Sequence, residues 1–248
     1  MLGLHRILST WSSQVDAYIA LTHFAKKKFI AGGIPKDKLF VKPNFLPVSP
    51  TEGVGERAYI LFVGRLTDEK GLNILLEAWK NIRTTLQLKI IGDGPLASTL
   101  ATQAKVLRGI EWLGQRDRDS VSTMMKNAFA LIVPSLWYEG FPMVVAEAYS
   151  VGLPVISSAV GSLEEVVTHG VTGRHFRPGD SQDLQTQIEW AINHPESMIE
   201  MRKNARERFL SRYTAEENHR LLMEIYDHTL GETSQQTDSS PQHPQSNS

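Results

Sequence analysis

The feature that most constrains this fold is the regular alternation of short apolar runs with segments of helical periodicity between residues 59 and 176. Strands that alternate with helices form a parallel sheet. The apolar runs have apolar residues at consecutive positions, which is typical of strands whose two faces are both covered by helices. The sequence therefore predicts an α/β fold built on a doubly wound, Rossmann-like parallel sheet. The predicted pairs of strand and helix are Tyr59–Val63 with Leu72–Ile82, Leu88–Ile91 with Leu96–Leu107, Ile110–Leu113 with Ser120–Ala128, Phe129–Val133 with Met143–Ser150, and Pro154–Ser157 with Ser162–Thr168, before a last strand at Arg174–Phe176.

Other elements flank this unit on both sides. Helices are predicted after it at Ser181–Asn193, Pro195–Ser211 and Ala215–Leu230, with Pro195 in a first turn and Thr214 as an N-cap. Before it, a strand at Val15–Ala20, a helix at Thr22–Ile30 and a strand at Leu39–Lys42 look like the end of another α/β unit. We therefore divide the chain into residues 1–45, a remnant of an amino-terminal domain with its linker, residues 46–212, the Rossmann-like domain, residues 213–230, a closing helix, and residues 231–248. The last segment contains no aliphatic or aromatic residue and is predicted to be disordered.

Composition excludes several classes of protein. The 26 basic and 27 acidic side chains give a net charge of −1, which argues against nucleic acid as a partner. The absence of cysteine excludes disulfides, thiolate metal sites and a cysteine nucleophile. No apolar run approaches the roughly 18 to 20 residues of a membrane-spanning helix. We expect a cytoplasmic protein whose contact with a membrane is at most peripheral, with the run Lys26–Lys28 as a solvated helix face that could touch acidic lipid.

Ligands of doubly wound sheets bind beyond the carboxyl ends of the strands, so the loops there are informative. The loop after Val63 carries Arg65, which offers a bidentate fork to phosphate, and Lys70, which offers a mobile point charge. Gly64 is expected to let the backbone turn sharply. The alternative is a solvated loop in which Lys70 pairs with Asp68 or Glu69.

The strongest signal is the loop and helix start that follow the most apolar strand, from Pro134 to Glu147. Pro142 suits the first turn of a helix, which leaves the N–H groups of Met143 and Val144 free to bind an anion.

Two glutamates flank this Gly140–Pro142 turn. Glu147 lies one helical turn after Met143, on the same face, where its carboxylate can accept both hydroxyls of a ribose. Glu139 lies on the other side of the phosphate site and can accept hydroxyls of a sugar. Either glutamate alone is also explained by favourable pairing with the helix dipole.

Weaker patterns carry alternative readings. Gly92–Ala97 formally matches a dinucleotide fingerprint, but the acidic residue that such a site needs at the end of the next strand is replaced by Glu111 at its start. An NAD(P)-dependent oxidoreductase is thus a remote alternative. Asp117 and Asp119 have a metal-binding spacing, yet their place at a helix start favours N-capping, and we expect no metal. Ser162 is a further candidate N-cap.

Taken together, these motifs resemble the carboxyl-terminal donor-binding half of a family 4 glycosyltransferase of the GT-B type. The resemblance implies a nucleotide-diphosphate sugar as donor substrate, retaining transfer of a hexosyl group, no cofactor and no essential metal. It further implies a role in polysaccharide or glycolipid biosynthesis, with an acceptor, a saccharide or lipid-linked saccharide, that the sequence does not identify. The motifs occur in the family's order from Val41 to Tyr226 and are Phe62–Leu66 with Lys70 and Gly71, Ile91–Pro95, Leu113 with Gly114, Pro134 with Ser135, Glu139 to Glu147 and Gly152–Ile156.

The same resemblance implies roles for individual residues. Arg65 and Lys70 would bind the diphosphate and stabilise the leaving group, Glu139 would hold the donor sugar, and these three are the expected catalytic residues. Glu147 would bind the ribose, and the base would lie near Trp112, Leu113 and Gly114. The other expected donor-binding residues are Gly64, Gly92, Gly140, Phe141, Pro142, Met143 and Val144.

One departure from the family pattern concerns the amino-terminal domain. Family members have two Rossmann-like domains, whereas Val15–Ile30 would be the last strand and helix of the acceptor-binding one. We therefore expect a fragment, a truncated gene product or one part of a split enzyme whose amino-terminal domain is a separate chain. A non-catalytic nucleotide-sugar-binding module or subunit is the main alternative. The closing helix is expected to expose an apolar stripe of Leu221, Leu222, Ile225 and Tyr226.

Overall fold

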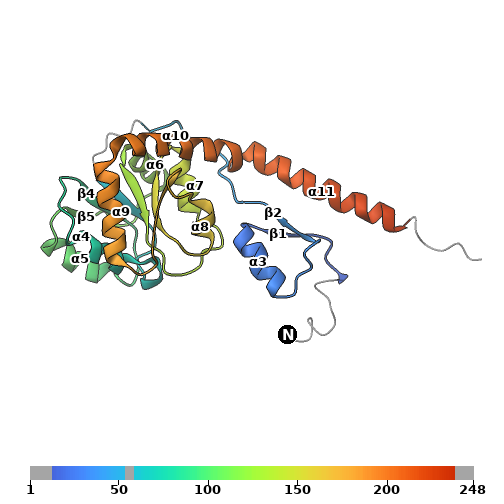
Figure 1. Cartoon of the computed structure of the whole chain (residues 1–248), viewed down its shortest axis with the longest axis horizontal. Helices are drawn as coiled ribbons and strands as arrows, with labels where there is room; N and C mark the ends of the chain where they lie inside the picture. The colour runs from blue at the N-terminus through green and yellow to red at the C-terminus, as the bar shows by residue number, and fades with distance from the viewer. Residues whose placement is uncertain (1–12, 54–58, 238–248) are drawn as a thin grey trace, which may run out of the picture.

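A six-stranded parallel sheet forms the centre of the main domain in the computed structural model, which describes residues 13–53 and 59–237, and the side chains of the last helix through Gly231 (Figure 1). The order of the strands is β5-β4-β3-β6-β7-β8, and every neighbouring pair is parallel. This is the predicted doubly wound sheet. The strands are β3 (Tyr59–Val63), β4 (Gln87–Ile91), β5 (Ile110–Trp112), β6 (Ala130–Val133), β7 (Val155–Ser158) and β8 (Gly173–Phe176).

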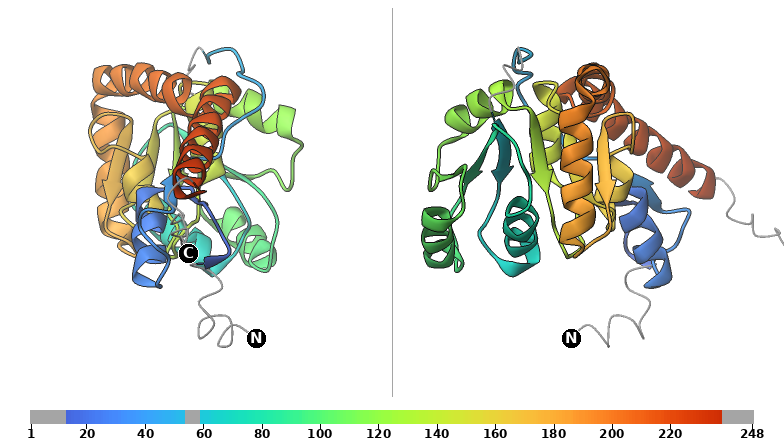
Figure 2. Two further views of the ribbon diagram at one scale, coloured as in Figure 1. Left: turned by 90° about the vertical axis from the view of Figure 1, so that its right-hand side faces the viewer. Right: turned by 60° about the vertical axis from the view of Figure 1, so that its left-hand side comes forward.

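Helices cover both faces of this sheet and create two hydrophobic cores (Figure 2). Side chains alternate between faces along β3: Leu61 belongs to one core, and Ile60 and Phe62 to the other. The Leu61 side is packed by α6 (Arg118–Asn127), α7 (Met143–Ser150), α8 (Ser162–Val166) and α10 (Pro195–Arg212). The opposite side is packed by α4 (Leu72–Trp79), α5 (Ala97–Val106) and α9 (Ser181–Asn193). Burial on both faces explains why the strands are apolar at consecutive positions.

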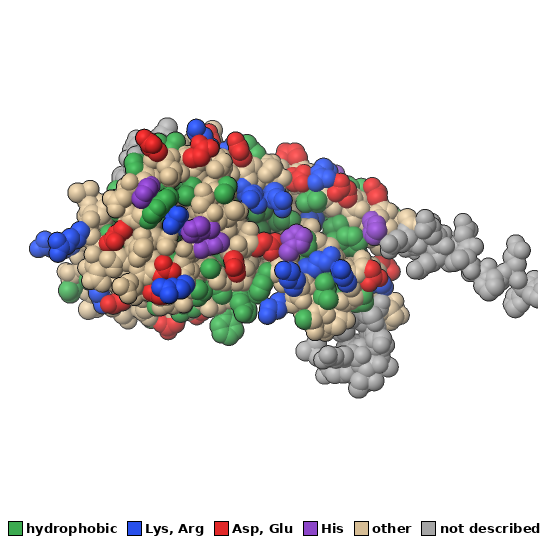
Figure 3. Space-filling model, in the orientation of Figure 1, with side chains coloured by type: hydrophobic (Ala, Val, Ile, Leu, Met, Phe, Trp, Pro, Cys, Tyr) green, Lys and Arg blue, Asp and Glu red, His purple; other side chains and the backbone are tan. Residues whose placement is uncertain are grey.

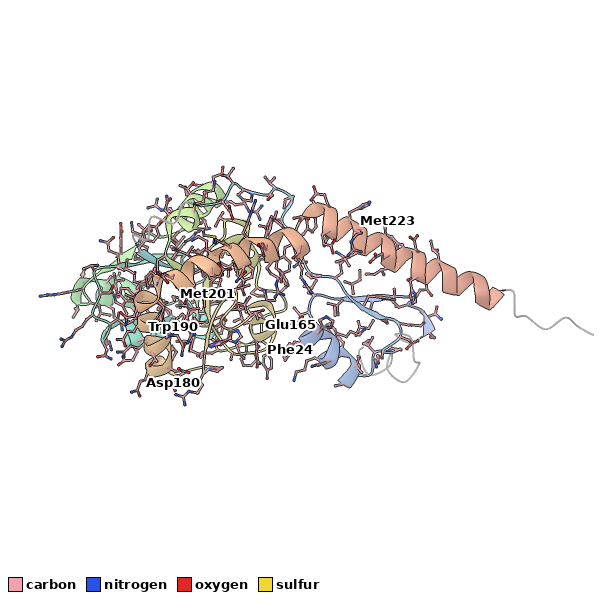
Figure 4. The ribbon with its side chains drawn as sticks, turned by 45° about the horizontal axis from the view of Figure 1, so that its top comes forward. Phe24, Glu165, Asp180, Trp190, Met201 and Met223 are labelled. Carbon is pink, nitrogen blue, oxygen red and sulfur yellow. The ribbon has the colours of Figure 1, made fainter. Side chains whose placement is uncertain are left out.

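The amino-terminal segment forms a separate small unit of β1 (Tyr18–Ala20), α3 (His23–Ala31) and β2 (Leu39–Val41), in which β1 and β2 are parallel neighbours. It docks on α8 through polar contacts. The carboxylate of Glu165 accepts hydrogen bonds from the backbone N–H groups of His23 and Phe24, at 2.9 and 2.8 Å, and Figure 4 labels Glu165 and Phe24 where the two helices meet. The hydroxyls of Thr22 and Ser162 are 3.1 Å apart. Glu165 thus binds the positive end of α3.

The last helix, α11 (Ala215–Thr237), leaves the main domain and extends along this amino-terminal segment (Figure 1). The Asn218 side chain accepts a hydrogen bond from Lys42 Nζ and donates one to the carbonyl of Pro43. Ile225 is buried, whereas Tyr226 is 54% exposed, so part of the predicted apolar stripe is covered.

The end of α11 differs from the predicted boundary at Gly231, because the helix continues to Thr237. Adding residues to an existing helix costs far less than nucleating one, so a polar segment can prolong it. Residues 1–12 of the predicted amino-terminal remnant and residues 238–248 of the predicted tail lie outside the described residues. None of the described helices combines the length and the hydrophobicity that crossing a bilayer requires.

Two predicted caps have different outcomes. Thr214 is confirmed as an N-cap, since its Oγ1 accepts a hydrogen bond from the Glu217 N–H at 3.2 Å. Ser162 is instead the first residue of α8, after Gly161, and its hydroxyl donates to the carbonyl of Gly140 at 3.2 Å.

We predict that Glu165→Ala loosens α3 from the main domain. The substitution leaves two N–H groups without their charged acceptor, which we expect to cost about 1 to 2 kcal/mol, or roughly a 5- to 30-fold change in a local opening equilibrium. Hydrogen exchange read by mass spectrometry should show faster exchange over residues 23–28. Glu164→Ala, which alters an exposed neighbour on the same helix, is the control. Equal exchange in both variants would show that Glu165 does not hold the segment.

Candidate functional site

The candidate site lies at the carboxyl ends of β3 and β6, which are neighbours in the sheet. The chain leaves β3 toward α4 on one face and leaves β6 toward α7 on the other face. Doubly wound sheets bind ligands at such a switch point, in the space between the two diverging loops, which we call the crevice. The two loops with the strongest sequence signals therefore meet at the place expected for a binding site.

Close backbone packing joins these two loops. The N–H of Leu136 donates to the carbonyl of Glu69 at 2.8 Å. Gly71 has a positive φ of 71°, and a Cβ on it would lie 1.8 Å from the carbonyl oxygen of Pro134. The predicted turn at Gly64 is present as a bend, but Gly64 has no positive φ and a Cβ there would meet ordinary contacts at 3.5 Å from Phe62, so the position in this loop that requires glycine is Gly71.

An ion pair spans the crevice at its base. Lys70 Nζ donates to Glu139 Oε1 at 2.8 Å, and the hydroxyl of Ser135 donates to the same oxygen at 2.7 Å. The two charged side chains are 33% and 17% exposed. The alternative of a solvated Lys70 paired within its own loop is therefore wrong; Asp68 accepts a hydrogen bond from Asn73. Ser135 was not among the predicted donor-binding residues, although it occurs in one of the motifs.

Arg65 remains at the surface beside this pair. Its side chain is 70% exposed, and its Nη2 lies 3.4 Å from Oε1 of Glu69, four residues further along the chain. Exposed pairs of this kind contribute little to stability and are easily exchanged. The Arg65 guanidinium is thus available to an anion in the crevice.

Helix α7 begins over the same crevice, with Pro142 as its N-cap residue. The carbonyl of Pro142 accepts from the Val145 N–H at 2.9 Å, whereas no partner for the N–H groups of Met143 and Val144 is found among the residues that the structure describes. These two donors at the positive end of a helix can bind an anion.

Glu147 lies one turn further along α7 and lines a cavity of about 630 Å³ together with Val63 and Arg118. Burial raises the pKa of the Glu147 carboxyl, and the charge of Arg118, 3.8 Å away, opposes that shift. Within the described chain no group donates a hydrogen bond to this carboxylate. It therefore retains its capacity to accept hydroxyl groups of a ligand.

The glycine-rich loop after β4 is explained by packing. A Cβ on Gly92, whose φ is 140°, would lie 1.9 Å from the carbonyl oxygen of Gly64, and the indole N–H of Trp112 donates to the Gly92 carbonyl at 3.0 Å. Glu111 lies in the middle of β5 and pairs with Lys89 at 3.2 Å. No acidic residue thus takes the ribose-binding place of a dinucleotide site, which disfavours the oxidoreductase alternative.

The capping interpretation of the Asp-x-Asp pattern is confirmed. Asp117 is the N-cap of α6, and its side chain accepts hydrogen bonds from the N–H and the hydroxyl of Ser120, at 2.8 and 2.9 Å. Among the described residues there is no group of three or more histidine or acidic side chains that could hold a metal ion.

The fold and the crevice define the carboxyl-terminal half of a GT-B structure. The profile of a family described as "Glycosyl transferases group 1" matches residues 50–208. The chain belongs to this family, and the resemblance found in its motifs is confirmed.

Curated relatives are enzymes of sugar transfer. The chain is 33% identical over 195 residues to "D-rhamnosyltransferase WbpZ" of Pseudomonas aeruginosa, covering 77% of this chain and 50% of the relative. It is 32% identical over 160 residues to "Glycogen synthase" of Mycobacterium tuberculosis, covering 62% of this chain and 38% of the relative. The chain thus spans about half the length or less of these relatives.

Solved structures share the fold. Anabaena Alr3699/HepE, crystallised with UDP, superposes with a TM-score of 0.79 at 21% identity over 86% of this chain and 64% of that one. The lipopolysaccharide outer core galactosyltransferase WaaB in its apo form gives a TM-score of 0.70 at 24% identity over 88% and 62%. At these identities the likeness concerns the fold.

We predict that Gly71→Ala destabilises the site and the protein. The new Cβ would clash with the Pro134 carbonyl in a backbone conformation that side chains rarely adopt, at a cost of about 1 to 3 kcal/mol. Urea unfolding measures this loss. Gly140→Ala is the matched control, because a Cβ on Gly140 meets nothing within 4 Å and its φ is not positive. A Gly71→Ala variant as stable as the Gly140→Ala variant would contradict the close packing of the two loops.

Proposed function

We propose that this chain is the donor-binding half of a retaining glycosyltransferase that binds a nucleotide-diphosphate sugar in the crevice between β3 and β6. The observation that carries this proposal is the Lys70–Glu139 pair, which joins the two loops, with Glu139 four residues before the start of α7 at Met143. The ammonium group of Lys70 matches the anionic diphosphate of such a substrate. The carboxylate of Glu139, which accepts hydrogen bonds, matches the hydroxyl groups of its sugar.

The diphosphate would be bound by three sets of donors. Lys70 and Arg65 contribute positive charge from the loop after β3, and the N–H groups of Met143 and Val144 approach from the other loop. Since the charges come from two loops, the diphosphate would bridge the switch point.

Donor binding would also change the partner of Lys70. In the free protein its ammonium group is held by Glu139. A diphosphate carries more negative charge than one carboxylate, so it would draw Lys70 away and leave Glu139 with a free oxygen. Glu139, still held by Ser135, could then accept hydroxyls of the donor sugar.

Glu147 would accept the ribose hydroxyls from its cavity behind the start of α7. The base would lie near Trp112, Leu113 and Gly114, at the end of β5. The rest of the donor site would be lined by the backbone of Gly64, Gly92 and Gly140 and by the ring of Phe141.

In the reaction, the bond between the anomeric carbon and the diphosphate oxygen breaks, and negative charge develops on the departing diphosphate. Lys70 and Arg65 would stabilise that charge, which lowers the barrier without a metal ion. The acceptor hydroxyl forms the new bond with the anomeric configuration retained. We assign no protein nucleophile to this step.

The comparisons support this proposal. Anabaena HepE has been crystallised with UDP and with UDP-glucose, and relatives include a rhamnosyltransferase and "Lipopolysaccharide 1,2-N-acetylglucosaminetransferase" of Salmonella typhimurium. We therefore propose a saccharide or lipid-linked saccharide as acceptor. Because the chain spans about half of such relatives, we propose that transfer also requires an amino-terminal acceptor domain, on this or another polypeptide.

We predict that UDP raises the melting temperature of the chain and that Arg65→Ala/Lys70→Ala abolishes the rise. A ligand at one hundred times its Kd adds about 2.7 kcal/mol, which corresponds to roughly 5 °C or more for a protein of this size. Thermal unfolding with and without UDP measures the shift.

The control for this variant is Lys80→Ala/Arg83→Ala, which removes the same charge from exposed positions outside the crevice. It should keep the full rise, and the rise should persist in excess chelator. A retained shift in Arg65→Ala/Lys70→Ala would refute the diphosphate site. Strict dependence on added magnesium or manganese would refute metal independence.

We predict that the two glutamates respond differently to two ligands. Glu147→Gln should weaken UDP and UDP-glucose about equally, by roughly ten-fold, because both ligands carry the ribose. Glu139→Gln should weaken UDP-glucose more than UDP. Calorimetric titration of both variants with both ligands measures these losses of affinity. If the ratio of the loss for UDP-glucose to the loss for UDP is the same in both variants, the assignment of the two glutamates is wrong.

Catalysis itself is a separate question from binding. Incubating the chain with labelled UDP-sugar and a separately expressed acceptor domain of a relative distinguishes a transferase half from a binding module. Product formation supports the former, and binding without product supports the non-catalytic alternative.

A further inference from the structure

A second cavity, of about 680 Å³, lies between the amino-terminal segment and the last two helices. It is distinct from the cavity at Glu147 and shares no lining residue with it. Its walls come from α3, β2, α8, the end of α10 and the start of α11, and Phe141 of the loop before α7 also lines it, with its ring centroid 5.5 Å from that of Tyr213. None of its charged residues belongs to the proposed donor site.

The charged groups of this cavity are mainly positive. Four cationic side chains line it, Lys26, Arg208, Arg212 and Arg220, against the two carboxylates Glu165 and Glu217. Figure 3 shows basic side chains gathered over the amino-terminal segment beside α11.

Both carboxylates already have close partners. Glu217 pairs with Arg220 at 2.6 Å, and Glu165 accepts the two N–H groups at the start of α3.

The other three cations have no ion-pair partner within 4 Å in the described part of the chain. The side chains of Lys26 and Arg212 make no hydrogen bond within the described residues, and Arg208 donates one to the hydroxyl of Thr168 at 3.1 Å. The charge of Arg212 interacts at longer range with the carboxylate of Glu217. Like charges that line one cavity repel one another. An anionic ligand would reduce that repulsion.

Tyr213 adds a hydroxyl group to this lining. The residue is 3% exposed and lines the cavity, and its hydroxyl makes no hydrogen bond within the described residues but is not fully buried. Burial raises the pKa of this phenol, and the charges of Arg208 and Arg212 oppose the shift. The hydroxyl is therefore available to donate to a ligand in the cavity.

We propose that this cavity binds the phosphate or diphosphate group of a second ligand, through Lys26, Arg208, Arg212 and the Tyr213 hydroxyl. Guanidinium groups and an ammonium group are the side chains that bind phosphate oxygens most strongly. The cavity is also lined by apolar side chains, those of Leu21, Phe40, Val41 and Leu221. The cavity can therefore hold a phosphate that is either free or attached to a hydrocarbon chain.

The test uses the full chain with Arg65→Ala/Lys70→Ala, so that a diphosphate cannot use the proposed donor site. Inorganic pyrophosphate and geranyl diphosphate are titrated by calorimetry, the first as a free diphosphate and the second as one with a hydrocarbon chain. We expect at least one of them to bind. Adding Lys26→Gln/Arg212→Gln should abolish that binding, and adding Tyr213→Phe should weaken it roughly ten-fold.

The matched control is Lys27→Gln/Lys203→Gln, which removes one charge each from α3 and α10 at exposed positions that do not line the cavity. It should leave binding unchanged. Absence of binding by both probes, or binding that survives Lys26→Gln/Arg212→Gln, would overturn the proposal.

A parallel titration separates this inference from the proposed function. UDP should bind the Lys26→Gln/Arg212→Gln variant as it binds the unmodified chain. UDP binding that is insensitive to Arg65→Ala/Lys70→Ala would refute the donor site. The second site is judged separately, by whether Lys26→Gln/Arg212→Gln abolishes the binding of pyrophosphate.

Discussion

The contact of the loop after β3 with the loop after β6 is the constraint on which the site depends. Parallel pairing of β3 with β6 brings the ends of both strands together, and the approach of Gly71 to the Pro134 carbonyl leaves no room for a side chain between the loops. Lys70 and Glu139 can pair only because of this packing. The two loops together therefore supply a cation, a carboxylate and the start of α7.

The amino-terminal segment adds a second layer to this arrangement. It is held on α8 by Glu165 and along α11 by Asn218, so contacts from two distant parts of the sequence fix its place. Tyr138, which precedes Glu139, packs its ring on Phe24 of α3 with centroids 4.9 Å apart. The donor loop therefore touches the amino-terminal segment directly. A change in how this segment docks would therefore move Tyr138, which is the residue next to Glu139.

Much of the fold could be predicted because its signals are local. Consecutive apolar residues marked the strands, and the start of α7 followed from Pro142 alone. The contacts between residues that are distant in the sequence could not be predicted in the same way. Lys70 and Glu139 are 69 residues apart, and only the order of strands in the sheet makes them neighbours. Ile225 was expected at the surface but is buried, and α11, which carries it, packs on β2 through the rings of His228 and Phe40. Arg212 and Tyr213 belong to no motif, and their cavity exists only where four helices and β2 come together.

A crystal structure of the chain with UDP would decide whether the switch point binds the diphosphate of the donor. We expect phosphate oxygens within hydrogen-bond distance of Lys70 Nζ and of the Met143 and Val144 N–H groups, the ribose on Glu147, and a Lys70 ammonium no longer bonded to Glu139. A diphosphate found elsewhere, with the Lys70–Glu139 pair at its present 2.8 Å, would show that the switch point is not the donor site.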